Sequence, residues 1–442
     1  MYVTNIHLEN LKSFKELAFD LKRPDGSFAG WTVFVGGNSS GKSTLLKGIA
    51  LALLGPESGR QLLGQTAGWI LKTEKRATAT ATIGWNADHD SFKKGGKHPG
   101  ATFEAGVRWY FEKPTDEIPQ FRAVDKRNAR GTREQMPERG PWNSNSYGWF
   151  SAGYGPMRRL TGSSSESMRY TVSKEIESRF VTLFREDAAL SESEEWLRKT
   201  HSRTLESSDP DQETLLTGVK DLLGDGLLPH GMKISRVTVD DVFIQDRRGL
   251  ELPMRDISDG CRSVYATILD LIHGMYEVYG AENLFAKDAA GKPFVTRPGV
   301  VIIDEIEAHL HPQWQKEIPY WLKTHFPKIQ FLVSSHSPLI AQAADPNGLF
   351  VLPLQDEVDR EPRPLTDKEF ERIRWGKAEK TLLGVAFGLR TTRSKWANQR
   401  VEHWKRLDAK KRAGQTLRGA DASEYKELKT QLDFALEPVS EL

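Results

Sequence analysis

The sequence is poor in cysteine, in long apolar stretches and in net charge. Its 442 residues include one cysteine, Cys261, which excludes an intrachain disulfide and a Cys-x-x-Cys motif. No apolar run approaches the roughly 18 residues that cross a membrane, and Met1 leads into a strand-like segment rather than a signal sequence. We therefore expect a cytoplasmic protein without membrane contact. The net charge of +2 excludes a polycation, and the length allows one large or two ordinary cores.

A glycine-rich loop near the N-terminus predicts a phosphate site. It follows the apolar stretch Trp31–Val35 and precedes a helix expected over Lys42–Leu54. The loop consists of Gly36, Gly37, Asn38, Ser39, Ser40, Gly41, Lys42, Ser43 and Thr44. In such a loop backbone N–H groups and the helix dipole face the phosphates, Lys42 reaches the β and γ oxygens, and Ser43 offers its hydroxyl to Mg²⁺. A chance glycine turn would not require this strand–loop–helix context, so ATP and Mg²⁺ are the predicted ligands.

Two later apolar strands end in residues suited to phosphate hydrolysis. Gly299–Ile303 is followed by Asp304 and Glu305, and Ile329–Val333 is followed shortly by His336. The order is similar to that of ATP-binding-cassette ATPases, which implies that Asp304 holds Mg²⁺ and Glu305 polarises the attacking water. His336 then corresponds to a switch histidine at the γ-phosphate. An exposed histidine at a strand end is the alternative interpretation.

Ser258 and Gly260 lie between the P-loop and Asp304, where cassette ATPases carry their signature loop. The resemblance implies that both residues contact the γ-phosphate held by a facing subunit, so that dimerisation completes the catalytic site. Alone, Ser-Asp-Gly is an ordinary turn or helix cap. The following residues, Arg262–Gly274, have one apolar face and predict the signature helix.

Further motifs place the resemblance more closely. The chain resembles the cassette-type ATPases of chromosome maintenance, recombination repair and overcoming of lysogenization defects, and is most similar to the ATPase subunit of Septu anti-phage systems, also found beside some retrons. The matching segments are Ile6–Phe14, Gly153–Leu160, Phe184–Leu197, Ile303–Pro312, Val333–Pro338 and Phe387–Ser394. The similarity covers most of the chain except about residues 86–148. It implies a homodimer or higher homo-oligomer that controls an associated nuclease of the His-Asn-His (HNH) type.

The signature departs from the pattern, with Ile257 for the usual Leu and Asp259 for the Gly of transporters. Gln61 and Gln65 are candidates for the glutamine loop by position only.

The expected fold is α/β, an ABC-type P-loop ATPase head with a helical tail. The head spans residues 1–364, with an antiparallel β lobe over about 1–160, a short helical arm over about 165–228 and an α/β lobe over about 232–355. Residues 365–442 form the tail. We expect a long irregular loop over Lys113–Asn145 and a surface loop over Glu277–Pro298.

The tail is locally basic, because Arg390–Arg418 holds ten basic and two acidic residues. Trp396 and Trp404 lie among them at helical spacing. The segment could bind nucleic acid by counterion release and stacking, or dock on an acidic partner, and the aromatic pair could equally belong to a core.

No assembled nuclease site is visible in the sequence. Glu307, His309 and His311 could gather a metal, but this stretch is also the loop that crosses the dimer interface in cassette ATPases. About 100 residues follow His336, and they lack the carboxylate pattern of a Toprim nuclease. DNA contact or cutting would therefore occur through or with a partner. The alternatives are a repair ATPase of the chromosome-maintenance type that clamps DNA, and the less favoured transporter motor.

Overall fold

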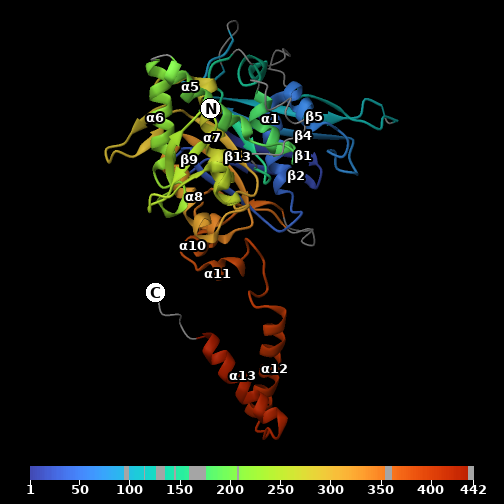
Figure 1. Ribbon diagram of the computed structural model, residues 1–442. Helices are drawn as coiled ribbons and strands as arrows, with labels where there is room; N and C mark the ends of the chain where they lie inside the picture. Colours follow the sequence, from blue (N-terminus) through green and yellow to red (C-terminus); the bar gives the residue numbers. More distant parts are fainter. Residues whose placement is uncertain are drawn as a thin grey trace. The chain divides into compact units, whose positions relative to one another are not determined.

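The computed structural model describes residues 1–93, 99–113, 115–125, 135–143, 146–158, 176–206, 209–353 and 361–436 (Figure 1). Part of the irregular loop expected over 113–145 and the start of the arm expected at 165 lie outside these residues. The chain forms two compact units. The first comprises Met1–Thr381 with Val385–Phe387, and the second Leu382–Gly384 with Gly388–Leu442, whereas the sequence analysis drew its boundary at residue 364.

An antiparallel sheet forms the N-terminal lobe of the first unit. Its order is β2-β1-β4-β5-β6, with β1 at Tyr2–Leu11, β2 at Phe14–Asp20, β4 at Arg76–Gly84, β5 at Thr102–Tyr110 and β6 at Gln120–Ala123. Alternating side chains of β4 and β5 are buried, which matches the alternation in the sequence. Strand β6 lies in the segment expected to be irregular, and that part of the expectation is wrong.

A mixed six-stranded sheet forms the second lobe. Its order is β16-β15-β3-β14-β13-β7, with β3 at Gly30–Val35, β7 at Ser151–Tyr154, β13 at Gly299–Ile303, β14 at Ile329–Ser335, β15 at Leu349–Val351 and β16 at Arg363–Pro364. The pairs β15–β3, β3–β14, β14–β13 and β13–β7 are parallel. The protein thus has the expected mixed α/β fold with an antiparallel lobe.

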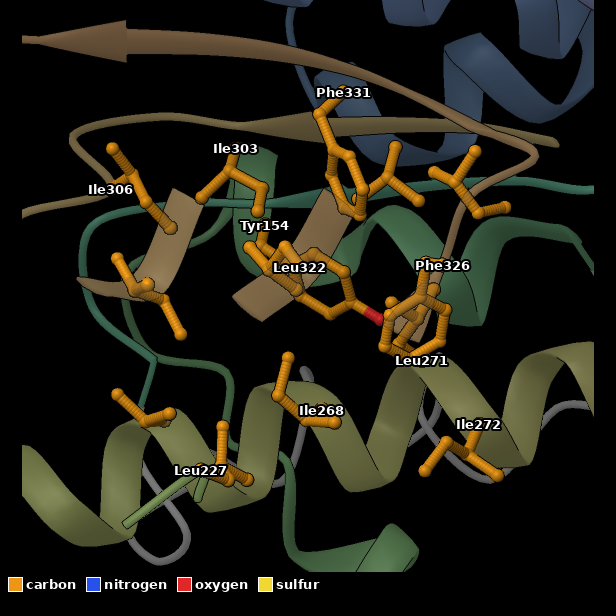
Figure 2. Close-up of a cluster of buried hydrophobic side chains, with 14 of the residues drawn as sticks. Tyr154, Leu227, Ile268, Leu271, Ile272, Ile303, Ile306, Leu322, Phe326 and Phe331 are labelled. Carbon is orange, nitrogen blue, oxygen red and sulfur yellow. The ribbon is translucent and has the colours of Figure 1, made fainter. Parts of the chain in front are cut away.

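Both faces of the central strands are covered, so their sequences read as continuous apolar runs. Val300, Ile302 and Leu332 belong to one core together with the helix that follows the P-loop. Their neighbours Ile303 and Phe331 point into the other core, where they meet the long helix α7 at Asp259–Tyr279 (Figure 2).

Helix α1 spans Lys42–Leu63, but Gly55 is not helical, so the regular helix that begins at Lys42 ends at Leu54 as expected and a second helical segment follows a kink. Gly55 has φ 78° and Pro56 has no N–H, so the carbonyl of Ala52 lacks its usual helical donor. The indole N–H of Trp142 donates to that carbonyl at 3.0 Å. A side chain from a distant segment thus provides the hydrogen bond that the Ala52 carbonyl cannot receive within the helix.

The remaining elements of the first unit are short helices, 3₁₀ turns and strands, together with the longer helices α5, α6 and α8. The helices are α2 (Met136–Arg139), α4 (Val181–Phe184), α5 (Ser191–Glu206), α6 (Pro210–Gly224), α8 (Pro312–His325), α9 (Pro338–Gln342), α10 (Asp367–Arg374) and α11 (Ala378–Leu382), and the 3₁₀ turns are η1 (Ile176–Phe180), η2 (Pro229–Gly231) and η3 (Met254–Asp256). The strands are β8 (Lys233–Val237), β9 (Val242–Gln245), β10 (Glu251–Pro253), β11 (Phe285–Lys287) and β12 (Pro293–Val295). The surface loop expected over Glu277–Pro298 is therefore a helix end followed by the β11–β12 hairpin.

The second unit is a helical hairpin of α12 (Lys395–Arg412) and α13 (Ala420–Leu436). Ion pairs and a stacked aromatic pair join the helices, namely Arg400–Glu427, His403–Glu424, Lys410–Asp421 and Trp404–Tyr425. Trp404 thus packs within the hairpin, whereas Trp396 is 66% exposed. None of the helices in the described ranges is both long and apolar enough to cross a membrane.

Candidate functional site

Four parallel strands bring the predicted site residues to one edge of the sheet. In the ladder Val35 lies opposite Ser335, and Ile303 lies opposite both Val333 and Tyr154. The P-loop, His336 and Asp304 follow these strand ends directly. Carboxyl ends of parallel strands in an open sheet are the usual ligand-binding edge of α/β proteins.

The P-loop is held by close contacts on both sides. Lys42 is buried, and its ammonium donates to the carbonyls of Gly36 at 3.0 Å and Gly37 at 2.9 Å. Burial lowers the pKa of Lys42, while the negative charges of Asp304, Glu305 and Glu307 act to raise it. These three carboxylates therefore lie close enough to share an electrostatic field with the lysine.

Gly41 has φ 92°, and a Cβ there would come within 2.5 Å of the Phe14 ring. The turn between β1 and β2 thus supports the loop from below, a contact that the sequence analysis did not predict. Gly41 occupies the N-cap position of α1 and supplies no side-chain cap. Asn38 and Ser39 in the loop are exposed, whereas Ser43 and Thr44 in the first turn of α1 are half-buried. The start of α1 accordingly presents backbone N–H groups to the loop interior.

One serine on β14 joins the carboxylate of Asp304 to the backbone of Glu305. The hydroxyl of Ser334 donates to Asp304 Oδ1 at 2.5 Å and accepts the backbone N–H of Glu305 at 2.8 Å. Glu305 has φ 48°, a left-handed conformation that is uncommon for a residue other than glycine. Ser334 therefore fixes the start of the turn that carries Glu305.

His336 is subject to the charges of Lys42 and of the same three carboxylates. Burial and the charge of Lys42 lower its pKa, and Glu307, Glu305 and Asp304 oppose the shift. The imidazole is therefore mainly neutral at pH 7. Its backbone N–H donates to one carboxylate oxygen of Glu307, and the other oxygen of Glu307 is buried without a hydrogen-bond partner.

Arg158, just after β7, is a site residue that sequence reasoning missed. It is 4% exposed, and its guanidinium donates to the carbonyls of Gly155, Asp304, Glu305 and Ile306 at 2.7, 2.9, 3.2 and 3.3 Å. An arginine in an irregular stretch gives no local sign of burial. The nearest signal was its position inside the segment Gly153–Leu160, which matched the resembled family.

The signature residues lie at the start of α7. Ser258 is exposed, occupies the N-cap position, and its hydroxyl donates to Cys261 Sγ at 3.0 Å. A Cβ on Gly260 would lie 2.4 Å from the carbonyl of His309, so the signature loop abuts the loop after Glu305. Ser258 thus bonds within its own helix turn and leaves its outer side open.

The other candidates do not assemble a metal site. His311 instead caps α8, its Nδ1 accepting the N–H of Gln313 at 3.3 Å, and His309 is exposed. Across the described ranges no group of three His, Cys, Asp or Glu side chains is arranged to hold a metal ion.

Gln61 lies in the last turn of α1 and Gln65 just beyond its C-terminus, whereas Lys42 is at its N-terminus. Gln65 lines a surface groove of about 970 Å³ between that helix end and β6.

Comparison with known proteins gives a family match over much of the chain. The family described as "AAA domain, putative AbiEii toxin, Type IV TA system" matches residues 31–341. The structure is also similar to the SMC head domain from Thermotoga maritima, with 13% identity and a TM-score of 0.41, covering 83% of this chain and all of that one.

The curated relatives include Septu and retron proteins. The Septu protein PtuA of Bacillus thuringiensis is 32% identical over 171 residues, 38% of this chain and 41% of that protein. The Septu protein PtuA of Bacillus mycoides is 25% identical over 338 residues, 76% of this chain and 38% of that protein. The "Retron Ec83 probable ATPase" of Escherichia coli is 24% identical, covering 79% of this chain and 71% of that protein. The chain thus spans about two fifths of the length of the two Septu relatives.

Proposed function

The chain belongs to this family of AAA domains, and from that premise we propose that it binds ATP with Mg²⁺ and hydrolyses the terminal phosphate. The observation that carries the proposal is the convergence of Lys42, Asp304, Glu305 and His336 at adjacent strand ends, within one electrostatic field. A structural ion cluster would not require a glycine loop and an uncapped helix start beside it.

The residues present fit the nucleotide and the metal. Lys42 now bonds to carbonyls of its own loop, and the Ser40 hydroxyl is buried without a partner, so the loop holds donors that phosphate oxygens would satisfy. Ser43 and Asp304 supply oxygen ligands, which Mg²⁺ prefers. When bound, Mg²⁺ would neutralise charge on the β and γ phosphates.

Glu305 would orient the attacking water, because its backbone is fixed by Ser334 and its carboxylate follows the proposed metal ligand. His336 would contact the γ-phosphate and this water as a neutral imidazole. Gly36, Gly37, Asn38, Ser39, Ser40, Gly41 and Thr44 would complete the phosphate cradle through backbone groups.

We further propose a homodimer or higher homo-oligomer in which Ser258 and Gly260 complete the site of the facing protomer. The support is that Ser258 is exposed and begins a 21-residue helix whose dipole would favour a phosphate. Its hydroxyl donates to Cys261 of its own turn, and its exposed side leaves room for a second chain.

The similarity to the Septu proteins supports an anti-phage role with a separate HNH nuclease. The chain would then need a docking surface. The second unit is the best candidate, because its basic helix α12 exposes Lys405, Arg406 and Lys411 and no step of the ATP chemistry requires it. A second candidate function is a DNA clamp, which the same basic surface favours.

The test is co-purification of the chain with the product of the adjacent reading frame. We expect deletion of the residues after Arg390, and the point variant Arg406→Glu, to abolish association with the nuclease while ATP binding persists. The matched control is Arg248→Glu, an exposed charge on the first unit, which should retain the partner.

Three outcomes would oppose this assignment. The first is an adjacent reading frame that encodes no nuclease. The second is Mg²⁺-dependent cutting of DNA by the purified chain alone. The third, salt-sensitive DNA binding by the isolated dimer without any partner, would favour the clamp.

A further inference from the structure

Arg158 holds the loop that carries the predicted hydrolytic residue from the side opposite Ser334. Three of its four carbonyl partners are consecutive residues, Asp304, Glu305 and Ile306, and the fourth is in its own segment after β7. The planar guanidinium presents donors in a fixed fork, so it can span several carbonyls that a single ammonium could not. One side chain therefore ties the end of β7 to the turn after β13.

The turn needs such support because its backbone is strained. Glu305 has φ 48°, and holding a non-glycine residue in this sparsely populated region costs free energy. Such a conformation persists only where the surroundings determine it. Here the N–H of Glu305 bonds to Ser334 and its carbonyl bonds to Arg158, so both ends of the residue are fixed.

The charge of Arg158 also matches its surroundings. Burial lowers the pKa of Arg158 to about 10, although Glu307, Asp304 and Glu305 act to raise it. The side chain therefore stays protonated at neutral pH, and its charge offsets carboxylates that would otherwise repel each other. Glu307, the largest of these electrostatic partners, is also the residue that accepts the backbone N–H of His336.

We propose that Arg158 is a positioning residue for ATP hydrolysis, setting the direction of Glu305 through the loop backbone and that of His336 through Glu307. This rests on the ATPase function proposed above. All four of its hydrogen bonds go to protein carbonyls, so Arg158 acts through other residues and leaves nucleotide binding to the P-loop. Its loss should therefore lower kcat much more than it weakens ATP binding.

The conservative variant Arg158→Lys tests this inference, because it keeps the charge and removes the fork. We expect kcat to fall on the order of 10- to 100-fold while the dissociation constant for ATP stays within about threefold. Arg158→Met, which also removes the charge, should lower kcat further. The matched control is Arg179→Lys, since burial also lowers the pKa of Arg179 but its guanidinium lies over the Phe150 ring, 5.4 Å from the ring centre.

A second readout does not depend on activity. The N–H of Ile306 donates to the carbonyl of Ser334 at 3.2 Å, so hydrogen exchange of a peptide covering residues 303–311 reports the order of the turn. Exchange should rise in Arg158→Lys and not in Arg179→Lys.

The two readouts separate the failures. If the wild-type protein binds ATP but never hydrolyses it, the proposed function is refuted. Faster exchange in Arg158→Lys would then still show that Arg158 orders the turn. The positioning inference is overturned if folded Arg158→Lys keeps wild-type kcat and exchange, or if ATP binding falls in parallel with kcat.

Discussion

At the scale of single residues, the hydrolytic edge is ordered by groups that never need to touch a nucleotide. Ser334 lies inside a fully buried strand, yet its hydroxyl serves both Asp304 and the N–H of Glu305. A buried hydroxyl is tolerated only when it is hydrogen-bonded, and here the bonds also fix the carboxylate of Asp304 and the backbone of Glu305. A polar residue near the end of an apolar strand can therefore indicate a side chain that orders the neighbouring site.

The two central residues of the site should separate binding from turnover. Glu305→Gln leaves the phosphate and metal ligands in place but removes the carboxylate, so the variant should bind ATP and hydrolyse it on the order of 10²-fold more slowly. Lys42→Ala should weaken binding itself, so that little ATP is bound, which titration calorimetry with ATP would measure.

Glu317→Gln is the matched control, because it makes the same change on an exposed position of α8. Near-normal turnover by Glu305→Gln would show that another group orients the water.

At the scale of elements, strong periodicity was the reliable guide. The strands β3 and β14 and the helix α7 lie where an apolar run or an apolar face predicted them. By contrast, the strand β6 has only one buried side chain, Phe121, and the hairpin β11–β12 consists of three-residue strands. Such short pairings leave no period to detect.

Two features of the site region depended on contacts between distant segments. Gly55-Pro56 is a normal helix stop, and α1 is kinked there, while Trp142, 90 residues away, donates to the Ala52 carbonyl that lacks its helical donor. From the sequence, Arg158 likewise looks like a surface cation. Only the fold shows that its guanidinium binds the carbonyls of residues 304–306. The sequence thus indicated the residues of the proposed phosphate site, which the fold brings to one sheet edge, but not the residues that hold their backbone in place.

The break in α1 yields a test of its own. Trp142→Phe keeps an aromatic ring and removes the indole N–H, leaving the Ala52 carbonyl without its donor. We expect a loss of about 1–3 kcal/mol in the free energy of unfolding, measured by urea denaturation.

Trp85→Phe is the control, because the Trp85 indole N–H also donates to a carbonyl, that of Gly100 at 2.7 Å, but in an exposed setting. Water can replace that bond, so its loss should cost clearly less. Equal losses in the two variants would argue that the Trp142 bond has no special role in α1.

At the scale of the whole molecule, the proposed site is divided between chains. The P-loop and Glu305 belong to one protomer, and Ser258 would come from the other. The exposed position of Ser258 at the start of α7 is compatible with such an arrangement. A substitution there should spare the P-loop of its own chain.

Mixing two inactive chains examines this directly. Ser258→Arg should bind ATP without turnover, and Lys42→Ala should bind it only weakly, yet a mixed dimer would hold one intact composite site. We expect ATPase activity to reappear on mixing, whereas each variant alone stays inactive. Mixed dimers confirmed by mass spectrometry that show no activity would count against a shared site.

The order of the central sheet also constrains how the protein is made. β3 pairs with β14, which the ribosome produces about 300 residues later. At ~5–20 residues per second, that gap amounts to roughly 15–60 s of synthesis. Meanwhile the P-loop helix can pack on β4 and β5, which are already present. A nascent chain would therefore carry a folded β lobe while the edge that joins Lys42 to Asp304 and His336 waits for strands still being translated.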